Sequence, residues 1–189
     1  MRIVGGDLRG RRLQAPEDGR VRPTSDRIRE ALFNVLAHAD FGDFSLQDAR
    51  ILDLFAGTGA LGLEALSRGG SFALFVDDDA TSRGLIRTNA ETLGLTGRTK
   101  IYRRDATKLG PRAASAGPAF DLVFIDPPYG KGLGERALAD LLAGDWLCPH
   151  AVVVLEEDKG VDVPVPSGFV ELDRRNYATT QVIIMTLGE

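Results

Sequence analysis

The stretch that decides the fold reads Arg50-Ile51-Leu52-Asp53-Leu54-Phe55-Ala56-Gly57-Thr58-Gly59-Ala60-Leu61-Gly62. The apolar run Arg50–Leu54 predicts a buried strand, and Ala60–Ser67 predicts the helix that follows it. The glycines between them permit a tight turn and let the backbone approach a ligand closely. The stretch therefore predicts the first strand, loop and helix of an α/β fold, with a loop suited to a nucleoside cofactor.

Strands and helices alternate along the rest of the chain. In chain order, the sequence predicts strands at 72–76, 99–103, 121–125 and 151–156 and helices at 80–93, 107–114 and 133–142. Such alternation implies a mostly parallel sheet covered on both faces. Two further strands, at 169–174 and 179–186, have no helix between them and are typical of a hairpin. We therefore expect a mostly parallel seven-stranded sheet with a C-terminal antiparallel hairpin.

The N-terminal part has a different composition. Residues 1–23 are rich in glycine and arginine, with short apolar runs at 2–4 and 12–14 that indicate a small hairpin or arm. Thr24-Ser25-Asp26 predicts a helix start. The apolar face of this helix comprises Ile28, Ala31, Leu32, Val35 and Leu36. We expect an arm and helix at 1–48 and a main α/β domain at 49–189.

Composition limits the class of protein. A chain of 189 residues with 43% hydrophobic content can bury one core. The single cysteine and two distant histidines, His38 and His150, predict neither a disulfide framework nor a metal site. No apolar run is long enough to cross a bilayer, and the N-terminus lacks a signal-peptide core. We expect a cytoplasmic protein that does not bind membranes, and a monomer.

Positive charge is concentrated in two places, although the net charge is −4. Residues 1–22 hold six arginines against three acids, and residues 98–112 hold six basic residues against Asp105 alone. Two basic patches on an acidic body suit a partner that is held through its phosphates. Solvated charged faces would give the same pattern. The arginines expected to contact phosphate are Arg9, Arg11, Arg12, Arg27, Arg103 and Arg104.

An acid follows or ends each of the first three core strands: Asp53, Asp77 and Asp105. Carboxyl ends of parallel strands share one edge of the sheet, where open α/β folds bind ligands. Gly57-x-Gly59-x-x-Gly62 matches a dinucleotide fingerprint, but Asp53 would repel a pyrophosphate at the helix N-terminus. It would favour a cation, such as the ammonium or sulfonium of S-adenosylmethionine. Asp77 would then accept from the ribose hydroxyls and Asp105 from the adenine amine.

Asp126-Pro127-Pro128-Tyr129 follows the strand at 121–125. Proline fixes φ and has no N–H, so the Asp126 carboxylate and the Pro127 carbonyl are held as acceptors. Tyr129 adds an aromatic face. A planar base with an exocyclic amine fits a site that has two acceptors beside an aromatic ring. An acidic turn after a strand is the plain alternative, and the conjunction with the three upstream acids argues against it.

These motifs together resemble a known family. Asp53–Gly59 resembles the first motif of class I S-adenosylmethionine-dependent methyltransferases, with a Rossmann-like fold, and residues 126–129 resemble the [DNS]PP[YF] motif of amino-nitrogen methyltransferases. Stretches 2–13 and 22–34 resemble the RsmD family. The resemblance to this family extends over essentially the whole chain. That resemblance implies methylation of a guanine N2 in small-subunit 16S ribosomal RNA, free or in an assembling 30S particle, of the position-966 type.

The resemblance also implies roles for single residues. Asp53 and the loop residues Ala56, Gly57 and Gly59 would line the methionine part of S-adenosylmethionine, the donor that becomes S-adenosylhomocysteine. Asp77 would hold the ribose, although relatives often carry glutamate there, and Asp105 with Ala106 would hold the adenine. Asp126, Pro127 and Tyr129 would hold the target base. Thr24 and Arg27 match a segment that looks like a lid over both ligands.

Other functions share parts of these patterns. A DNA adenine- or cytosine-amine methyltransferase would carry both motifs. However, one helix and the remaining strands account for the chain after Tyr129, so we expect no separate DNA-reading domain there. A glutamine-amide methyltransferase would be expected to carry asparagine at position 126. Asp53 and the absence of a recognisable hydride-transfer site oppose a dinucleotide oxidoreductase. A non-catalytic RNA-binding module would not need the acceptors at 126–129.

Overall fold

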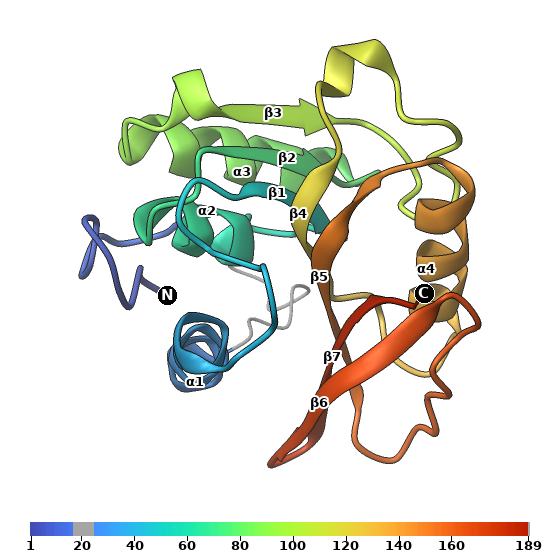
Figure 1. Ribbon diagram of the computed structural model, residues 1–189. Helices are drawn as coiled ribbons and strands as arrows, with labels where there is room; N and C mark the ends of the chain where they lie inside the picture. Colours follow the sequence, from blue (N-terminus) through green and yellow to red (C-terminus); the bar gives the residue numbers. More distant parts are fainter. Residues whose placement is uncertain (17–24, 189) are drawn as a thin grey trace.

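The computed structural model describes residues 1–16 and 25–188. Its centre is a seven-stranded sheet in the order β3-β2-β1-β4-β5-β7-β6 (Figure 1). The strands are β1 (Arg50–Leu54), β2 (Phe72–Val76), β3 (Thr99–Tyr102), β4 (Phe120–Ile125), β5 (Leu147–Asp158), β6 (Phe169–Tyr177) and β7 (Thr180–Leu187). The first five pair in parallel, and β7 pairs antiparallel with both β5 and β6. The predicted mixed sheet with its closing hairpin is therefore confirmed.

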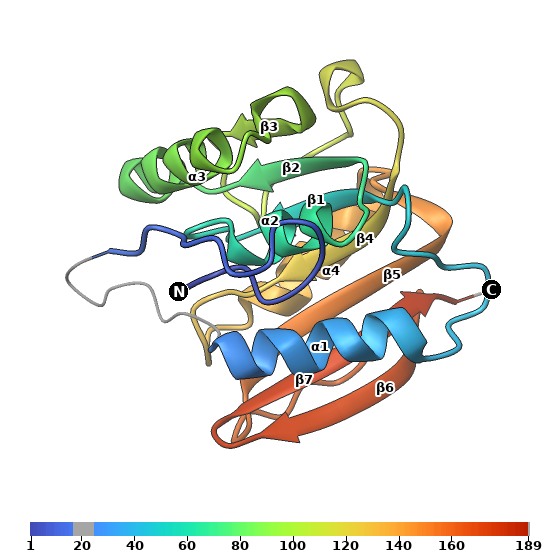
Figure 2. The ribbon, with the colours of Figure 1, turned by 90° about the vertical axis from the view of Figure 1, so that its left-hand side faces the viewer.

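Helices cover both faces of this sheet. Helices α1 (Asp26–His38), α2 (Ala60–Ser67) and α3 (Ala80–Thr92) lie on one face, and α4 (Leu133–Ala143) lies on the other (Figures 1 and 2). Each strand of the parallel part sends alternate residues to each face, so the apolar residues form two core clusters. Phe33 of α1 packs on Phe124 of β4 with ring centroids 5.6 Å apart, which joins α1 to the core of the sheet. Within the described residues, none of the helices is long and apolar enough to span a membrane.

The prediction of a helix at 107–114 is wrong. A single 3-10 turn, Ala114–Ala116, forms there, and the chain before it runs as a loop. Gly110 adopts a φ of 66°, and Pro111 has no N–H to give to a helix. The Asp140 carboxylate of α4 instead accepts the backbone N–H groups of Leu109 and Gly110, at 2.6 and 3.1 Å. A side chain from a distant helix thus satisfies this segment's donors.

The N-terminal arm is a small antiparallel turn, as expected, with Arg2 and Arg12 forming a bridge. The side chain of Asn89, buried in α3, anchors the end of the arm. It accepts the Gln14 N–H at 2.7 Å and donates to the Gln14 and Thr58 carbonyls at 3.1 and 3.0 Å. One amide therefore joins the arm to α3 and to the glycine loop after β1.

Ser25 is the N-cap of helix α1, and its hydroxyl accepts the Ile28 N–H at 3.2 Å. Its buried face contains Leu32, Val35 and Leu36 as predicted, but it also contains Arg29 and Phe33. Arg29 is fully buried because it belongs to an ion network.

Glu64 of α2 is the centre of that network. Its carboxylate is fully buried and lies 2.8 Å from Arg68 Nε and 3.6 Å from Arg29 Nε. It also accepts the Val4 N–H at 2.9 Å. Arg29 in turn donates to Asp26 at 2.8 Å and to the Arg2 carbonyl. Buried charges of this kind cost much free energy when one partner is removed. The network therefore holds the arm, α1 and α2 together.

We predict that Glu64→Gln lowers the free energy of unfolding by about 3 kcal/mol, because it leaves the buried Arg29 charge less compensated. For a chain of this size the melting temperature should fall by roughly 10 °C, measured by calorimetry. Glu91→Gln changes an exposed carboxylate of α3 in the same way and is the matched control. Equal melting temperatures for the two variants would contradict the assigned role of Glu64.

Candidate active site

Three neighbouring strands bring their carboxyl ends together. In the order β2-β1-β4, Asp77 follows β2, Asp53 lies one residue before the end of β1, and Asp126 follows β4. A cavity of about 460 Å³ opens at this edge. It is lined by Met1, Asp53, Phe55, Ala56, Gly57, Thr58, Ala60, Leu61, Asp77, Asp78, Asp79, Ser82, Asp126, Pro127, Pro128 and Tyr129. The edge predicted from the sequence is therefore a real concave site that carries several carboxylates.

The glycine loop at the base of the cavity has an unusual backbone. Gly57 and Gly59 have φ values of 57° and 77°, which glycine adopts at little cost. Phe55 also has a positive φ, 55°, and a side chain in that region is strained. Gly59 serves as the N-cap of α2 and is not among the residues that line the cavity. Residues 55–58 of this turn all line the cavity.

Asp53 is buried at the point where β1 meets this loop. Its side chain accepts the Gly62 N–H at 2.9 Å, which ties the strand end to the first turn of α2. Burial raises the pKa of Asp53 to about 8, because little water remains to solvate its charge, and the nearby Asp77 adds to the rise. A cation in the cavity would reverse this effect. Asp53 is therefore a group whose charge depends on what binds beside it.

Asp77 and Asp79 have different tasks. Asp77 accepts the Gly57 N–H with one oxygen and the Asp79 N–H with the other, both at 2.9 Å. Burial raises its pKa. Asp79 is the N-cap of α3 and accepts the Ser82 N–H at 2.7 Å. Of the three consecutive acids, Asp79 is thus the helix cap, and Asp77 braces the glycine loop from the second strand.

The loop after β4 is supported from behind by two acids of β5. The Tyr129 hydroxyl donates to Glu156 at 2.5 Å, and the Gly130 N–H donates to Glu157 at 3.0 Å. Both glutamates are buried at the carboxyl end of β5. The pKa of Tyr129 is raised, first by burial and then by the charges of Asp126 and Glu156. The hydroxyl therefore stays protonated and anchors the ring that lines the cavity.

Sequence reasoning missed Glu156 and Glu157. The signal was present, since an acid ends the fifth core strand just as acids end the earlier ones. It also gave no role to several uncharged residues that line the cavity, namely Met1, Phe55, Thr58, Ala60, Leu61 and Ser82. They come from the arm, from the loop after β1 and from the first turns of α2 and α3.

Besides Gly59, two proposed cofactor residues, Asp105 and Ala106, do not line this cavity. Asp105 lies after β3 and accepts the backbone N–H and the hydroxyl of Thr107, at 2.8 and 2.7 Å, through one oxygen. These bonds lower its pKa. Ala106 is buried beside it. The structure thus gives Asp105 a local turn-forming contact. Thr24, the proposed lid residue, lies outside the described residues.

The proposed RNA-contacting arginines differ in exposure. Arg9, Arg12, Arg27 and Arg103 are exposed, and Arg11 is exposed while donating to the Thr92 carbonyl at 2.6 Å. Arg104 is half-buried, donates to the Leu109 carbonyl at 2.9 Å and lies 5.2 Å from the centre of the Tyr102 ring. Arg104 therefore organises the loop after β3 as well as adding charge to it.

Parallel strands that end in an acidic cavity, with a closing antiparallel hairpin, define a class I methyltransferase. A family model described as Conserved hypothetical protein 95 matches residues 1–186. The chain is 38% identical to Ribosomal RNA small subunit methyltransferase D of Escherichia coli, over 94% of this chain and 85% of that protein. It is 36% identical to YlbH of Bacillus subtilis, over 97% of both chains. The solved structure of Escherichia coli yhhF superposes with a TM-score of 0.82 at 32% identity, covering 99% of this chain and 97% of that one. The chain belongs to this family, the RsmD family of methyltransferases.

The buried Asp53 predicts a specific pH dependence of stability. Its pKa is about 8 in the folded chain, against an ordinary value of 3.8, so between about pH 4 and pH 8 only the unfolded chain ionises it. Its contribution to stability is therefore lost as pH rises through this window. Asp53→Asn keeps an acceptor for Gly62 but cannot ionise. The variant should gain stability relative to the original chain between about pH 5 and pH 8, measured by urea unfolding.

The control is Asp43→Asn, at an exposed loop carboxylate, which should follow the original chain at both pH values. A constant difference between Asp53→Asn and the original chain would contradict the raised pKa.

Proposed function

We propose that this protein transfers a methyl group from S-adenosylmethionine to the exocyclic N2 of a guanine in small-subunit ribosomal RNA. The observation that carries the proposal is the single cavity that joins Asp53 and Asp77 to Asp126, Pro127 and Tyr129. The name of the Escherichia coli relative, a ribosomal RNA small subunit methyltransferase, supports the choice of RNA. The N2 atom and a position of the 966 type rest on the family resemblance.

The residues of the cavity suit this cofactor. When bound, it supplies an electrophilic methyl group on a positively charged sulfur. Asp53, whose pKa is raised to about 8 by burial, gains a counter-ion if the bound molecule carries a cation beside it. Residues 56–58 would offer backbone groups, and Asp77 would accept from ribose hydroxyls while it braces Gly57. A volume of about 460 Å³ lies within the usual range for small-molecule sites.

The loop at 126–129 would bind the guanine. Asp126 and the Pro127 carbonyl would accept the two N–H bonds of the amine, which turns its lone pair away from the ring. The negative charge of Asp126 and the carbonyl dipole of Pro127 would favour the nitrogen that becomes positive as the new N–C bond forms and the S–C bond of the donor breaks; the nitrogen would then lose one proton to give the neutral product. Tyr129 would stack on the base, with its ring held through the hydrogen bond to Glu156. Positioning of this kind is expected to supply most of the rate enhancement.

The exposed arginines of the arm and of the β3 end would hold RNA through its phosphates. Asn89 hydrogen-bonds both the arm and the glycine loop, so RNA binding to the arm would be linked to the position of the cavity loop. Thr24 and Arg27 would belong to the covering segment. We propose that the protein acts as a monomer in the cytoplasm, where small-subunit particles assemble, with the arm at 1–48 serving the domain at 49–189.

A methyl-transfer assay tests this function. Purified protein is incubated with methyl-labelled S-adenosylmethionine and naked 16S RNA, immature small-subunit particles or duplex DNA. We expect label on one or both ribosomal substrates, and nuclease digestion followed by mass spectrometry should give N2-methylguanosine. Label on DNA adenine or cytosine would support the other amine methyltransferases. Binding of NAD without binding of S-adenosylmethionine would sink the proposal.

Asp126→Ala tests the site itself. The variant should lose methyl transfer by roughly 100-fold or more, because it lacks the acceptor for the amine. It should still bind S-adenosylmethionine in calorimetry with near-normal affinity. Asp78→Ala removes a neighbouring carboxylate of the same cavity and is the matched control, with a much smaller loss. Near-normal turnover of Asp126→Ala would remove this residue from the mechanism.

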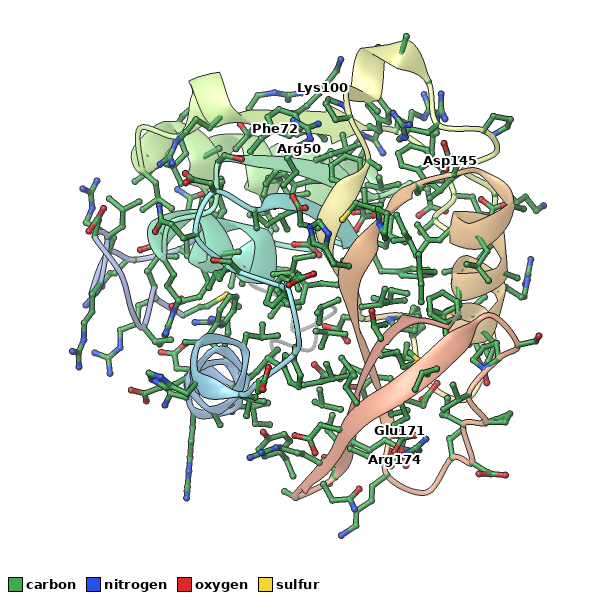
Figure 3. The ribbon with its side chains drawn as sticks, in the orientation of Figure 1. Arg50, Phe72, Lys100, Asp145, Glu171 and Arg174 are labelled. Atoms are coloured by element: carbon green, nitrogen blue, oxygen red, sulfur yellow. The ribbon has the colours of Figure 1, made fainter. Side chains whose placement is uncertain are left out.

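The arginine assignment predicts a change in salt dependence. Replacing the exposed Arg9, Arg12 and Arg103 by glutamine should weaken RNA binding and make the plot of log affinity against log salt shallower by about 2. Arg174→Gln is the control, because Arg174 pairs with Glu171 at 2.7 Å on β6 (Figure 3). An unchanged slope in the triple variant would place the RNA elsewhere on the surface.

A further inference from the structure

A second group of chemically reactive side chains lies at the opposite edge of the sheet. Asp121 of β4 and Cys148 and His150 of β5 present one ligand atom each, all within 4.8 Å of one another. Asp121 precedes Asp126 by five strand residues, which is about 16 Å along β4. The cluster is therefore separate from the cavity. We propose that these three residues form a binding site for a zinc ion.

The local backbone brings the three side chains together. The pairing of β4 with β5 changes register between Phe120 and Leu122, whose partners are Leu147 and Val152. The extra residues of β5 bulge at this point, and Pro149, which cannot donate to a ladder, lies within the bulge. Cys148 and His150 therefore both reach Asp121 on the neighbouring strand. Counting histidines and cysteines along the sequence misses the cluster because the third ligand comes from another strand.

The distances already resemble a metal site. Asp121 Oδ1 lies 3.2 Å from Cys148 Sγ and 3.3 Å from His150 Nε2. Ligands on a tetrahedral zinc ion, at their usual bond lengths, are about 3.4–3.6 Å apart. Two edges of the tetrahedron are thus nearly formed. The third edge, between Cys148 and His150, is at most 4.8 Å long, and the side chain of His150 is 47% exposed.

The surroundings orient the carboxylate. The other oxygen of Asp121, Oδ2, accepts the backbone N–H of Arg50 at 2.8 Å, which directs Oδ1 toward Cys148 and His150. Such outer contacts are typical of metal ligands. The Arg50 guanidinium donates instead to the Ala116 carbonyl at 2.7 Å and lies over the Phe72 ring at 4.5 Å (Figure 3). The guanidinium hydrogen bonds therefore go to backbone carbonyls rather than to Oδ1, while the Arg50 charge lies close enough to Asp121 to interact with it.

The ligand chemistry selects the ion. A thiolate and an imidazole bind zinc and other borderline-soft ions, whereas magnesium and calcium prefer oxygen ligands alone. Binding replaces the thiol proton of Cys148, which is released to solvent, by a Zn–S bond. The charges of one thiolate, one carboxylate and Zn²⁺ then sum to zero. A water molecule would complete the tetrahedron on the exposed side of His150.

Cobalt titration tests this site, because Co²⁺ takes the place of Zn²⁺ and shows a thiolate-to-metal charge-transfer band. The chain has one cysteine, so such a band reports Cys148 alone. Chelator-treated full-length protein should show the band, saturating at one equivalent of Co²⁺, and added Zn²⁺ should abolish it. Zn²⁺ should also raise the melting temperature.

Variants separate the ligands. Cys148→Ser should abolish the band and the thermal shift, and His150→Gln and Asp121→Asn should weaken Co²⁺ binding by roughly 10-fold or more. His38→Gln, which removes the other histidine, should bind as the original chain does. Methyl transfer by Cys148→Ser should stay within about twofold of the original, which also shows that this variant folds. Absence of the band in the original chain, or its persistence in Cys148→Ser, would overturn the proposal.

Discussion

Two carboxylates that brace one loop are the constraint on which the site depends. Asp53 of β1 accepts the Gly62 N–H, and Asp77 beyond β2 accepts the Gly57 N–H. The loop between β1 and α2 is thereby tied at both ends to neighbouring parallel strands. Phe55 keeps its strained positive φ in a loop that these bonds fix on either side, whereas Gly57 and Gly59 adopt positive φ at little cost. Burial away from water raises the pKa of Asp53 to about 8, and the nearby Asp77 adds to the rise.

The arm is built into the fold by polar contacts rather than by apolar burial alone. Glu64 accepts from the arm at Val4 and pairs with Arg29 of α1 and with Arg68, the C-cap of α2. The buried Asn89 side chain likewise joins the arm to the rest of the fold, because it hydrogen-bonds both Gln14 of the arm and Thr58 of the glycine loop. Buried polar groups need specific partners, so they fix one arrangement where apolar contacts would allow several. The N-terminal residues thus reach the cavity edge in a defined position, with Met1 among its lining residues.

Local patterns predicted most of the elements, and the failures have identifiable causes. Strands β1 and β2 were predicted to the residue, because each is a short apolar run bounded by turn residues. The helix at 107–114 was wrong because Asp140, from a helix far along the chain, satisfies the loop in its place. Arg29 was not expected in the core, since its partner Glu64 is distant in sequence. Both of these misses involve a polar contact between segments that are distant in sequence.

The sequence by itself determined the class of fold, the family and the edge of the sheet where the acids gather. Those features follow from hydrophobic periodicity and from motifs a few residues long, which are written locally in the chain. Tertiary structure alone decided which acids share the cavity, that Glu156 holds Tyr129, and that Asp121 meets Cys148 and His150. These outcomes depend on strand order, register and burial. Strand order, register and burial arise only when segments distant in sequence pack together and exclude water. No local sequence pattern therefore encodes these three contacts.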